Sequence, residues 1–373
     1  MTRFSSRHVF FSFRAASERT EKPPPIGGEI WYNGRCQRVP VFCLKTLTNA
    51  LPVMNILNAE GNPKMNRLFE WKRWPHPVIP AVPGTWKETY TANADVVEWG
   101  DAYYMYYRGT GQGHDRIGAL TASRDRFDGE HWEEAVEGPV LDVGAPGSYD
   151  DEDLLDPSAA VANGTIYLYY SALGSTGEWI GLATSTDGIR FTKKDQPVMR
   201  GRCPEIVYRD GRFYLYYVRD NAVGGYDIHL AISDDGVSFA DRKEPALSVG
   251  GAEAWDGKTV TTPRIFYDRG LYYMIYAGDD RTKDDPSRFG LATSRDLTTW
   301  TKYEGNPIFR VSDDGWDNTA LWYGTVERID GAYWMWYEAS NAYDLRGTPY
   351  YISAIGLARL DAPYFYVDPE SNE

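Results

Sequence analysis

A tyrosine-rich strand pattern recurs five times along the chain and constrains the fold more than any other feature. The pattern ends at Tyr107, Tyr170, Tyr217, Tyr276 and Tyr337, with spacings of 63, 47, 59 and 61 residues. Repeats of this length, with aromatic strands and almost no helical periodicity, are typical of propeller blades that carry insertions. We therefore expect an all-β protein that folds as a five-bladed β-propeller.

Other segments recur in a fixed order around each tyrosine-rich strand. An apolar strand starts fourteen residues before the final Tyr of each repeat. A third strand, which ends in a Ser/Asp turn, follows the tyrosine-rich strand. A fourth strand with a Pro completes each of the first four repeats, but the fifth repeat lacks it. The same pattern occurs at residues 71–79 instead. We expect this N-terminal strand to complete the last blade and remove a free sheet edge.

The first strand of each blade is expected to line the central channel. Side chains alternate along a strand, so two residues that are two positions apart near its start face the channel together. Across the five repeats these positions hold Asn93 and Asp95, Asp156 and Ser158, Cys203 and Glu205, Thr262 and Arg264, and Tyr323 and Thr325. Three carboxylates and one guanidinium from four blades are therefore predicted to converge on one funnel.

Two segments of the second repeat resemble a known enzyme superfamily. Asp156-Pro157-Ser158-Ala159, followed by the hairpin at residues 163–170, resembles the second blade of the five-bladed propeller glycosidases of families 43, 32, 117 and 130. Residues 144–151 are similar to family 117 in particular. The resemblance covers residues 71–360 as an architecture. It implies glycosidase activity with acids from the first three blades.

Carried over residue by residue, the resemblance names Asp95, Asp156 and Glu205 as catalytic residues. Asp156 matches the motif directly, whereas Asn93-Ala94 stands in place of the Asp-Pro pair in the first blade. In the third blade Arg202 replaces the usual Glu, and Glu205 follows Pro204. One acid must protonate the leaving oxygen and a second group must attack or activate water. The sequence leaves open whether the configuration is retained or inverted.

Further residues are predicted to bind substrate around the mouth of the funnel. They are an acid of the loop before the second blade, charged residues that follow tyrosine-rich strands, the channel arginine, two non-repeating aromatic residues and a rim histidine. These candidates are Asp151, Arg108, Glu338, Arg264, Trp322, Tyr323 and His114. Action on a terminal residue is favoured if long loops such as 143–155 and 278–288 narrow the pocket.

The residues that recur regularly are interpreted as structural. The tyrosine-rich strands are expected to pack between blades, although aromatic rings also bind sugars. The Asp residues of the Ser/Asp turns are expected to bond the backbone of their hairpins. Asp150, Asp256 and Asp317, which follow an aromatic residue ahead of three blades, are expected to bond loops.

Three functions agree with these observations. The leading one is a glycoside hydrolase that cleaves a terminal glycosidic bond of an oligo- or polysaccharide. The second is an inverting glycoside phosphorylase of similar fold, in which Arg108, Arg202 and Arg264 hold phosphate, since Arg matches phosphate oxygens bidentately. The third is a carbohydrate-binding propeller without catalytic activity, an interpretation that the departures in the first and third blades support.

Charge and composition exclude several other classes. The net charge of −14 argues against a nucleic-acid partner, which needs a basic surface. The sequence has no run of 18 apolar residues, so no membrane-spanning helix is predicted. Its 3 cysteines make neither a disulfide framework nor a zinc motif. No cofactor is expected to be required and no metal-ligating set is apparent, although the resemblance allows a structural calcium ion in the channel.

The first 64 residues differ from the rest of the chain. They carry a net charge of +5, whereas residues 65–373 carry −19. We expect residues 1–64 to be a basic extension that is disordered or accessory, and residues 65–373 to be the catalytic propeller. No clear signal peptide is present, which favours the cytoplasm, and the sequence leaves the oligomeric state open.

Overall fold

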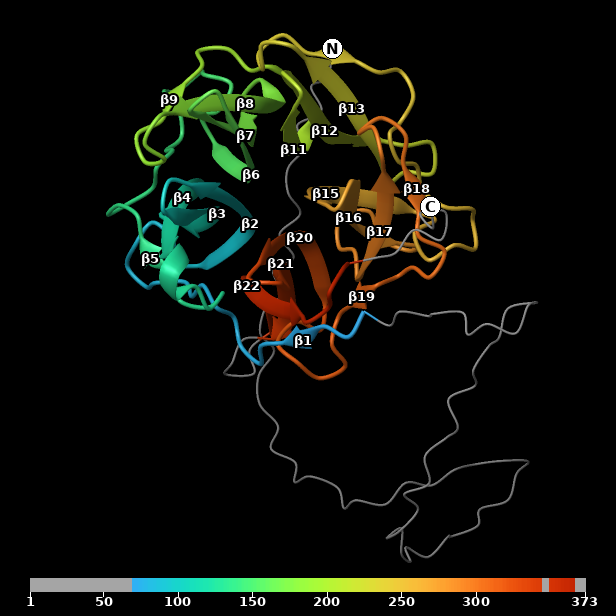
Figure 1. Ribbon diagram of the computed structural model, residues 1–373. Helices are drawn as coiled ribbons and strands as arrows, with labels where there is room; N and C mark the ends of the chain where they lie inside the picture. Colours follow the sequence, from blue (N-terminus) through green and yellow to red (C-terminus); the bar gives the residue numbers. More distant parts are fainter. Residues whose placement is uncertain (1–68, 344–348, 366–373) are drawn as a thin grey trace, which may run out of the picture. The chain divides into compact units, whose positions relative to one another are not determined.

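The computed structural model describes residues 69–343 and 349–365 of the chain. Within them, five antiparallel sheets are arranged around a common centre, as the predicted five-bladed β-propeller requires (Figure 1). The only helix among the described residues is the short 3-10 turn η1 (Arg124–Arg126). The predicted all-β fold is confirmed. The predicted basic extension at residues 1–64 lies outside the described residues.

Each blade consists of four strands that run outward from the centre. The innermost strands are β2 (Tyr90–Trp99), β6 (Asp153–Ala162), β11 (Arg202–Arg209), β15 (Thr259–Asp268) and β20 (Ala320–Ile329). The tyrosine-rich second strands are β3 (Ala102–Gly111), β7 (Thr165–Gly174), β12 (Arg212–Asp220), β16 (Leu271–Asp279) and β21 (Ala332–Tyr343). The third strands are β4 (His114–Ser123), β8 (Gly177–Ser185), β13 (Tyr226–Ser233), β17 (Arg288–Ser294) and β22 (Pro349–Leu360).

The outermost strands are only two residues long. They are β5 (Glu133–Glu134), β9 (Thr192–Lys193), β14 (Ala240–Asp241), β18 (Thr301–Lys302) and β1 (Lys72–Arg73), and β10 (Met199–Arg200) and β19 (Phe309–Arg310) extend the second and fourth blades. Strand β1 pairs antiparallel with β22, so the N-terminal strand completes the last blade as predicted. The contact continues along the chain, because the amide of Val78 donates to the carbonyl of Ile355 at 2.8 Å.

The tyrosine-rich strands lie in the core between blades. Tyr107, Tyr170, Tyr217, Tyr276 and Tyr337 are all fully buried, which confirms their predicted packing role. Their faces pack against side chains of neighbouring strands, and apolar burial of this kind is the main favourable contribution to folding. These tyrosines are therefore unavailable as sugar platforms.

In three blades, the hydroxyl group of this tyrosine lies beside an ion pair that joins a loop to the outermost strand. In the fourth blade, Asp256 accepts a hydrogen bond from Tyr276 at 3.1 Å and lies 2.5 Å from the ammonium of Lys302. Asp150 and Asp317 take equivalent places in the second and fifth blades, with Lys193 and Arg73 as their cations. The three recurring Asp residues thus have the loop-bonding contacts that were predicted.

The first blade carries the same kind of pair with its charges exchanged. Lys87 occupies the loop position that holds Asp in three other blades, and it pairs with Glu134 of the outermost strand β5. The first blade therefore keeps the ion pair between the loop and the outermost strand, but the positive and negative residues have exchanged places.

Candidate active site

A β-bulge near the start of every innermost strand shapes the centre of the propeller. In the second blade, the pairing of β6 with β7 shifts between Leu155 and Ser158, which leaves one extra residue on the inner strand. The other four blades shift at the equivalent place. A bulge bends its strand and turns a side chain in a new direction. The five bulges therefore change which side chains face the channel.

The bulged residues have backbone angles that are unusual for their types. The φ angle is 52° at Asn93, 55° at Asp156, 54° at Cys203, 44° at Thr262 and 48° at Tyr323. A positive φ is strained for a β-branched or bulky residue, and such strain concentrates at functional sites. We call these five residues the floor layer, because all of them line one cavity.

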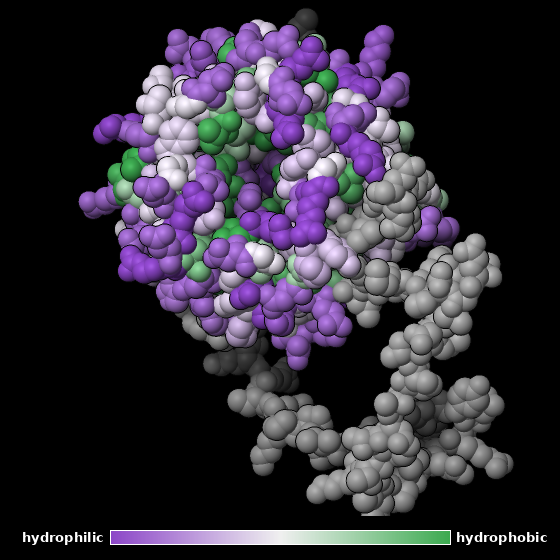
Figure 2. Space-filling view, in the orientation of Figure 1, coloured by the Kyte–Doolittle hydropathy of each residue, from purple (hydrophilic) through white to green (hydrophobic). Residues whose placement is uncertain are grey.

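The cavity above the floor layer has a volume of about 320 Å³. Its walls come from the inner strands, from the second and third strands of some blades and from the loop between β16 and β17. Besides the floor layer, the lining residues are Tyr90, Arg108, Leu155, Arg202, Tyr226, Thr261, Lys283, Asp284, Asp285, Trp322, Glu338 and Ser353. Figure 2 shows the ring of blades hollowed at its centre.

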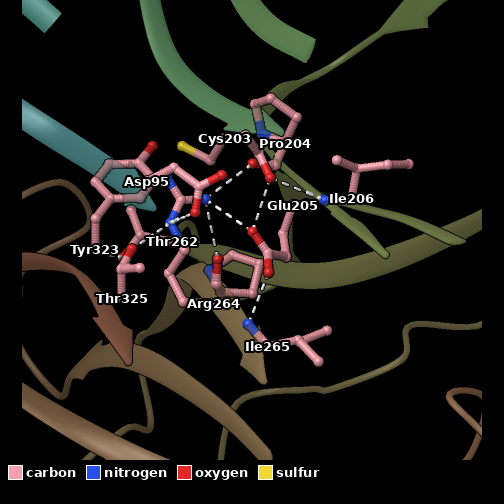
Figure 3. Close-up of polar contacts among 12 residues, drawn as sticks. Asp95, Cys203, Pro204, Glu205, Ile206, Thr262, Arg264, Ile265, Tyr323 and Thr325 are labelled. Atoms are coloured by element: carbon pink, nitrogen blue, oxygen red, sulfur yellow. Dashed lines mark hydrogen bonds and ion pairs between the residues drawn. The ribbon is translucent and has the colours of Figure 1, made fainter. Parts of the chain in front are cut away.

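A second layer closes the channel two residues further along the same strands. We call it the sealing ring, and it consists of Asp95, Ser158, Glu205, Arg264 and Thr325. Figure 3 shows Arg264 at its centre. The guanidinium donates to Glu205 Oε2 at 3.0 Å and to Thr325 Oγ1 at 3.1 Å, and its Nε lies 3.9 Å from Asp95 Oδ1.

The carboxylates of the sealing ring have their hydrogen-bonding capacity occupied. Glu205 also accepts from the hydroxyl of Ser158 at 2.9 Å and from the amide of Ile265 at 2.7 Å. Asp95 accepts from the amide of Ala159 at 2.7 Å. Burial raises the pKa of Glu205 to about 7 and raises that of Asp95, against the opposing effect of Arg264.

Asp156 differs from the carboxylates of the sealing ring in that part of it has no partner. Its side-chain Oδ2 is buried and lacks a hydrogen-bond partner within the described residues, and the residue is only 4% exposed. A buried polar atom without a partner is costly, so each case calls for an explanation. The hydroxyl of Tyr323 and the Nε of Arg108, which also line the cavity, are buried without partners among the same residues.

Glu338 lines the cavity as well, but it is engaged by several donors. Asn93 donates to its Oε2 through the side-chain amide, and Ser353 donates to its Oε1. Arg108 lies 3.5 Å away from Glu338 and 3.7 Å from Asp115. Burial raises the pKa of Glu338, and the two carboxylates together hold the pKa of Arg108 above its usual value.

The opposite wall carries two cations around one tyrosine. Arg202 Nη1 donates to the hydroxyl of Tyr226 at 3.2 Å, and the ammonium of Lys283 lies 4.4 Å from the centre of the Tyr226 ring. Asp284 accepts a hydrogen bond from the same hydroxyl at 3.0 Å, and its carbonyl accepts from the Trp322 indole at 2.8 Å. These contacts fix the loop between β16 and β17 against the cavity, as the predicted narrowing role of residues 278–288 requires.

The structure separates the predicted site residues into two groups. Asp156, Arg108, Trp322, Tyr323 and Glu338 line the cavity. The other predicted residues, which do not line it, are Asp95, Glu205, Arg264, Asp151 and His114. Asp151 accepts hydrogen bonds from the amides of Gly147 and Ser175, and His114 Nδ1 lies 2.6 Å from the carbonyl of Glu152.

The cavity also contains residues that were not predicted as site residues. Tyr90, Tyr226, Lys283 and Asp284 fall outside the repeated pattern, so no repeat position pointed to them. The available signal was the insertion between β16 and β17, which supplies two of the four. Arg202 was predicted only as a phosphate ligand, and it lies on the cavity wall.

Within residues 69–343 and 349–365, no group of three or more His, Cys, Asp or Glu side chains is arranged to hold a metal ion. In the same part of the chain, no helix is long and apolar enough to cross a membrane.

Comparison with known sequences relates the chain to phosphorylases. Residues 203–338 match the model of glycoside hydrolase family 130, described as beta-1,4-mannooligosaccharide phosphorylase. The 1,2-beta-oligomannan phosphorylase of Thermoanaerobacter sp. (strain X514) is 27% identical over 232 residues, which cover 56% of this chain and 72% of that protein. The uncharacterized protein Rv1502 of Mycobacterium tuberculosis (strain ATCC 25618 / H37Rv) is 26% identical, over 78% of this chain and 99% of that protein.

Solved structures show the same fold. A thermostable family-43 glycoside hydrolase superposes with a TM-score of 0.60 at 22% identity, over 77% of this chain and 94% of the other. The beta-1,2-mannobiose phosphorylase of Listeria innocua superposes with a TM-score of 0.61 at 15% identity, over 78% and 96% of the two chains. The resemblance predicted from the sequence is therefore confirmed: the chain shares the five-bladed propeller fold of these enzymes, and residues 203–338 resemble family 130.

Proposed function

We propose that the protein is an inverting glycoside phosphorylase that cleaves a terminal β-mannosidic bond with inorganic phosphate. One observation carries the proposal: the cavity combines Asp156, the carboxylate with an unpartnered oxygen, with the cations Arg108, Arg202 and Lys283. Phosphorolysis needs one acid for the leaving oxygen and a site for a dianionic nucleophile. Hydrolysis by inversion needs a second carboxylate that is free to activate water.

The other acids of the cavity have partners. Glu338 accepts from Asn93 and Ser353 and lies beside Arg108, and Asp284 accepts from Tyr226. Both oxygens of Glu338 already accept hydrogen bonds, so this carboxylate is less available to take a proton from an attacking water molecule. The arrangement therefore favours an external nucleophile over water.

In the proposed reaction, Asp156 acts as the general acid. The bond between the anomeric carbon and the leaving oxygen breaks, and Asp156 gives that oxygen its proton. A phosphate oxygen forms a new bond to the anomeric carbon from the opposite face, so the configuration inverts. The proton of hydrogen phosphate replaces the one that Asp156 has given up. The products are a sugar 1-phosphate and an oligosaccharide shortened by one residue.

The phosphate site is proposed at Arg202 and Lys283. Both cations lie against Tyr226, on the same wall of the cavity, and Arg202 presents a planar set of donors suited to phosphate oxygens. Mannose as the sugar rests on the relatives, two of which are named for phosphorolysis of mannose oligomers.

Hydrolysis at the same site is the second candidate. It is favoured by Glu338, a second carboxylate that lines the cavity and whose pKa burial raises. In this case Glu338 would activate a water molecule, and this water rather than phosphate would attack the anomeric carbon from the face opposite Asp156. The reaction products distinguish the two candidates, because hydrolysis releases a free sugar.

The test is product analysis with β-1,2- and β-1,4-linked manno-oligosaccharides, with and without inorganic phosphate. We expect phosphorus NMR to detect mannose 1-phosphate only when phosphate is present. Asp156→Asn should lose this activity, and Asp234→Asn, at a carboxylate that is 83% exposed, should keep it. Free mannose without phosphate would establish hydrolysis instead. Oligosaccharide binding with no product in either condition would establish a binding protein.

A further inference from the structure

Arg264 contacts the innermost strand of every blade. Its guanidinium faces Asp95 of the first blade, the carbonyl of Pro157 of the second, Glu205 of the third and Thr325 of the fifth, while its own strand β15 belongs to the fourth (Figure 3). The residue is only 2% exposed. It was predicted to bind substrate, yet it does not line the substrate cavity. We therefore asked what a fully buried cation does at this place.

Two of its hydrogen bonds end directly behind the floor layer. Arg264 Nη2 donates to the carbonyl of Pro157 at 2.8 Å, and Pro157 follows Asp156. Arg264 Nη1 donates to the carbonyl of Pro204 at 3.2 Å, and Pro204 follows Cys203. These carbonyls belong to the bulged segments whose preceding residues have positive φ. The guanidinium thus holds the strained backbone of two blades from below.

The side chain of Asp156 depends on its backbone for its orientation. Its Oδ2 has no hydrogen-bond partner in the described part of the chain, and its amide makes a 3.5 Å contact with Asn93 Oδ1. The place of the carboxyl therefore depends on the φ angle of Asp156 and on the position of the peptide bond to Pro157, whose carbonyl accepts a hydrogen bond from Arg264.

The same guanidinium supports a second residue of the floor. The central carbon of the Arg264 guanidinium lies 4.6 Å from the centre of the Tyr323 ring. A cation over an aromatic face is attractive, and more so when both groups are desolvated. Tyr323 is 2% exposed and its hydroxyl has no hydrogen-bond partner within residues 69–343 and 349–365. Arg264 therefore fixes the position of the Tyr323 ring at the base of the cavity.

We propose that Arg264 is a positioning residue, which holds the Asp156 carboxyl and the Tyr323 ring in the geometry that the substrate requires. The proposal rests on the proposed function, in which Asp156 is the general acid. It assigns Arg264 no contact with substrate. Its role is carried by three kinds of contact at once: the carbonyl bonds, the cation–π contact and the pairing with Glu205.

The test uses Arg264→Lys and Arg264→Ala in the full-length chain. A lysine keeps the charge but cannot bond several carbonyls at fixed angles, because its donors converge on one atom. Misplacement of a reacting group by about 1 Å can cost about 10²-fold in rate. We expect kcat to fall about 10-fold in Arg264→Lys and about 10²-fold in Arg264→Ala. The KM for the oligosaccharide should change less than about 3-fold.

Chemical rescue separates positioning from general stability. Arg264 borders a second cavity of about 210 Å³ on the far side of the sealing ring, through which a small ion can reach the space left in Arg264→Ala. Guanidinium at millimolar concentration should restore at least 5-fold in kcat, whereas methylammonium should restore less than 2-fold. Wild-type enzyme treated in the same way is the control. Wild-type kcat in both variants, measured well below their Tm, would overturn the proposal.

Two further variants keep the test decisive. Thr325→Val removes the acceptor at 3.1 Å from Arg264 Nε and leaves the arginine in place, so it tests the role even where Arg264 variants do not fold. We expect kcat to fall about 3-fold, and an unchanged kcat would count against the proposal. Asp156→Asn distinguishes the two proposals. Activity retained in Asp156→Asn would refute the proposed function, whereas an inactive Asp156→Asn beside fully active Arg264 variants would refute only the positioning role.

Discussion

The floor layer and the sealing ring lie two residues apart on the same five strands, yet they differ in how far their polar groups are hydrogen-bonded and in the cavity that they line. The floor layer contains the unpartnered Oδ2 of Asp156 and the unpartnered hydroxyl of Tyr323. The sealing ring joins its charges in one network around Arg264. The layer with unsatisfied groups lines the cavity of about 320 Å³, and the satisfied layer borders a second, smaller cavity of about 210 Å³ on its other side. The bulges thus separate the floor layer, which lines the proposed active site, from the sealing ring, which supports it.

The largest expected difference between the layers is in activity. Asp156→Asn should lower turnover about 10³-fold, because a general acid contributes typically 10²–10⁴-fold. Its Tm should stay the same or rise, since a buried carboxylate oxygen without a partner is replaced by a neutral group. Turnover and thermal unfolding of the same preparations test this. A large drop in Tm would mean that Asp156 supports the fold, as the sealing ring does.

The opposite result is expected one layer below. Glu205→Ala should reduce the free energy of unfolding by about 3–5 kcal/mol, because it leaves Arg264, Ser158 and the amide of Ile265 without their acceptor. Urea unfolding measures this loss. Glu244→Ala, at an exposed glutamate, should change stability by less than about 0.5 kcal/mol.

The sequence could predict the blades but not this separation of layers. The recurring Tyr strands and the missing fourth strand were enough to predict five blades and their closure by residues 71–79. The two inward positions of each blade were also found. The bulge between them leaves no signal in the sequence, so Asp95, Glu205 and Arg264 could not be told apart from the residues of the cavity.

The walls of the cavity were harder to predict for a different reason. Lys283 and Asp284 lie on an insertion in one blade, and their positions depend on the contacts of Trp322 and Tyr226 with that loop. Such contacts join blades and have no counterpart in a single repeat. The exchanged pair Lys87 and Glu134 could not be predicted either, because the first repeat holds a cation where three others hold an acid.

A cation of the cavity wall should affect binding of phosphate more than the chemical step. Arg202→Met should raise the KM for phosphate about 10- to 100-fold, because a charge-assisted contact is lost. Unfolding should change little, since the Arg202 side chain is 35% exposed. Arg200→Met, at an exposed arginine of the neighbouring strand β10, is the matched control and should leave the KM unchanged. An equal effect in both variants would contradict a local phosphate site.

The sealing ring should also reveal itself in the pH dependence of stability. Burial raises the pKa of Glu205 from 4.5 to about 7 in the folded chain. The folded state then binds the proton more tightly than the unfolded state, so this group stabilises the fold below pH 4.5 and that contribution is lost as the pH rises through 7. The Tm of Glu205→Gln, relative to wild type, should therefore rise over this interval. A constant difference would contradict the raised pKa.

A pair far from the channel should have the smallest effect. Lys302→Met removes the cation that pairs with Asp256 beside Tyr276, and its side chain is 28% exposed. We expect a loss of about 1 kcal/mol in unfolding free energy and no change in kcat. Lys243→Met, at an exposed lysine, should change neither quantity. A change in kcat in Lys302→Met would show that the channel is coupled to the outer strands.

The closing strand has a consequence for the order in which the molecule can be assembled. Lys72 pairs with Asp361, and these residues are separated by 289 positions in the chain. During synthesis, β1 emerges before any blade, but its partner β22 emerges last. Contacts between such distant segments form slowly because a long loop must first close. The sealing ring needs Asp95 and Thr325 together, so Arg264 gains its full set of partners only after β20 of the fifth blade has been synthesised. We therefore expect removal of β22 to prevent the propeller from closing, rather than merely shorten one sheet.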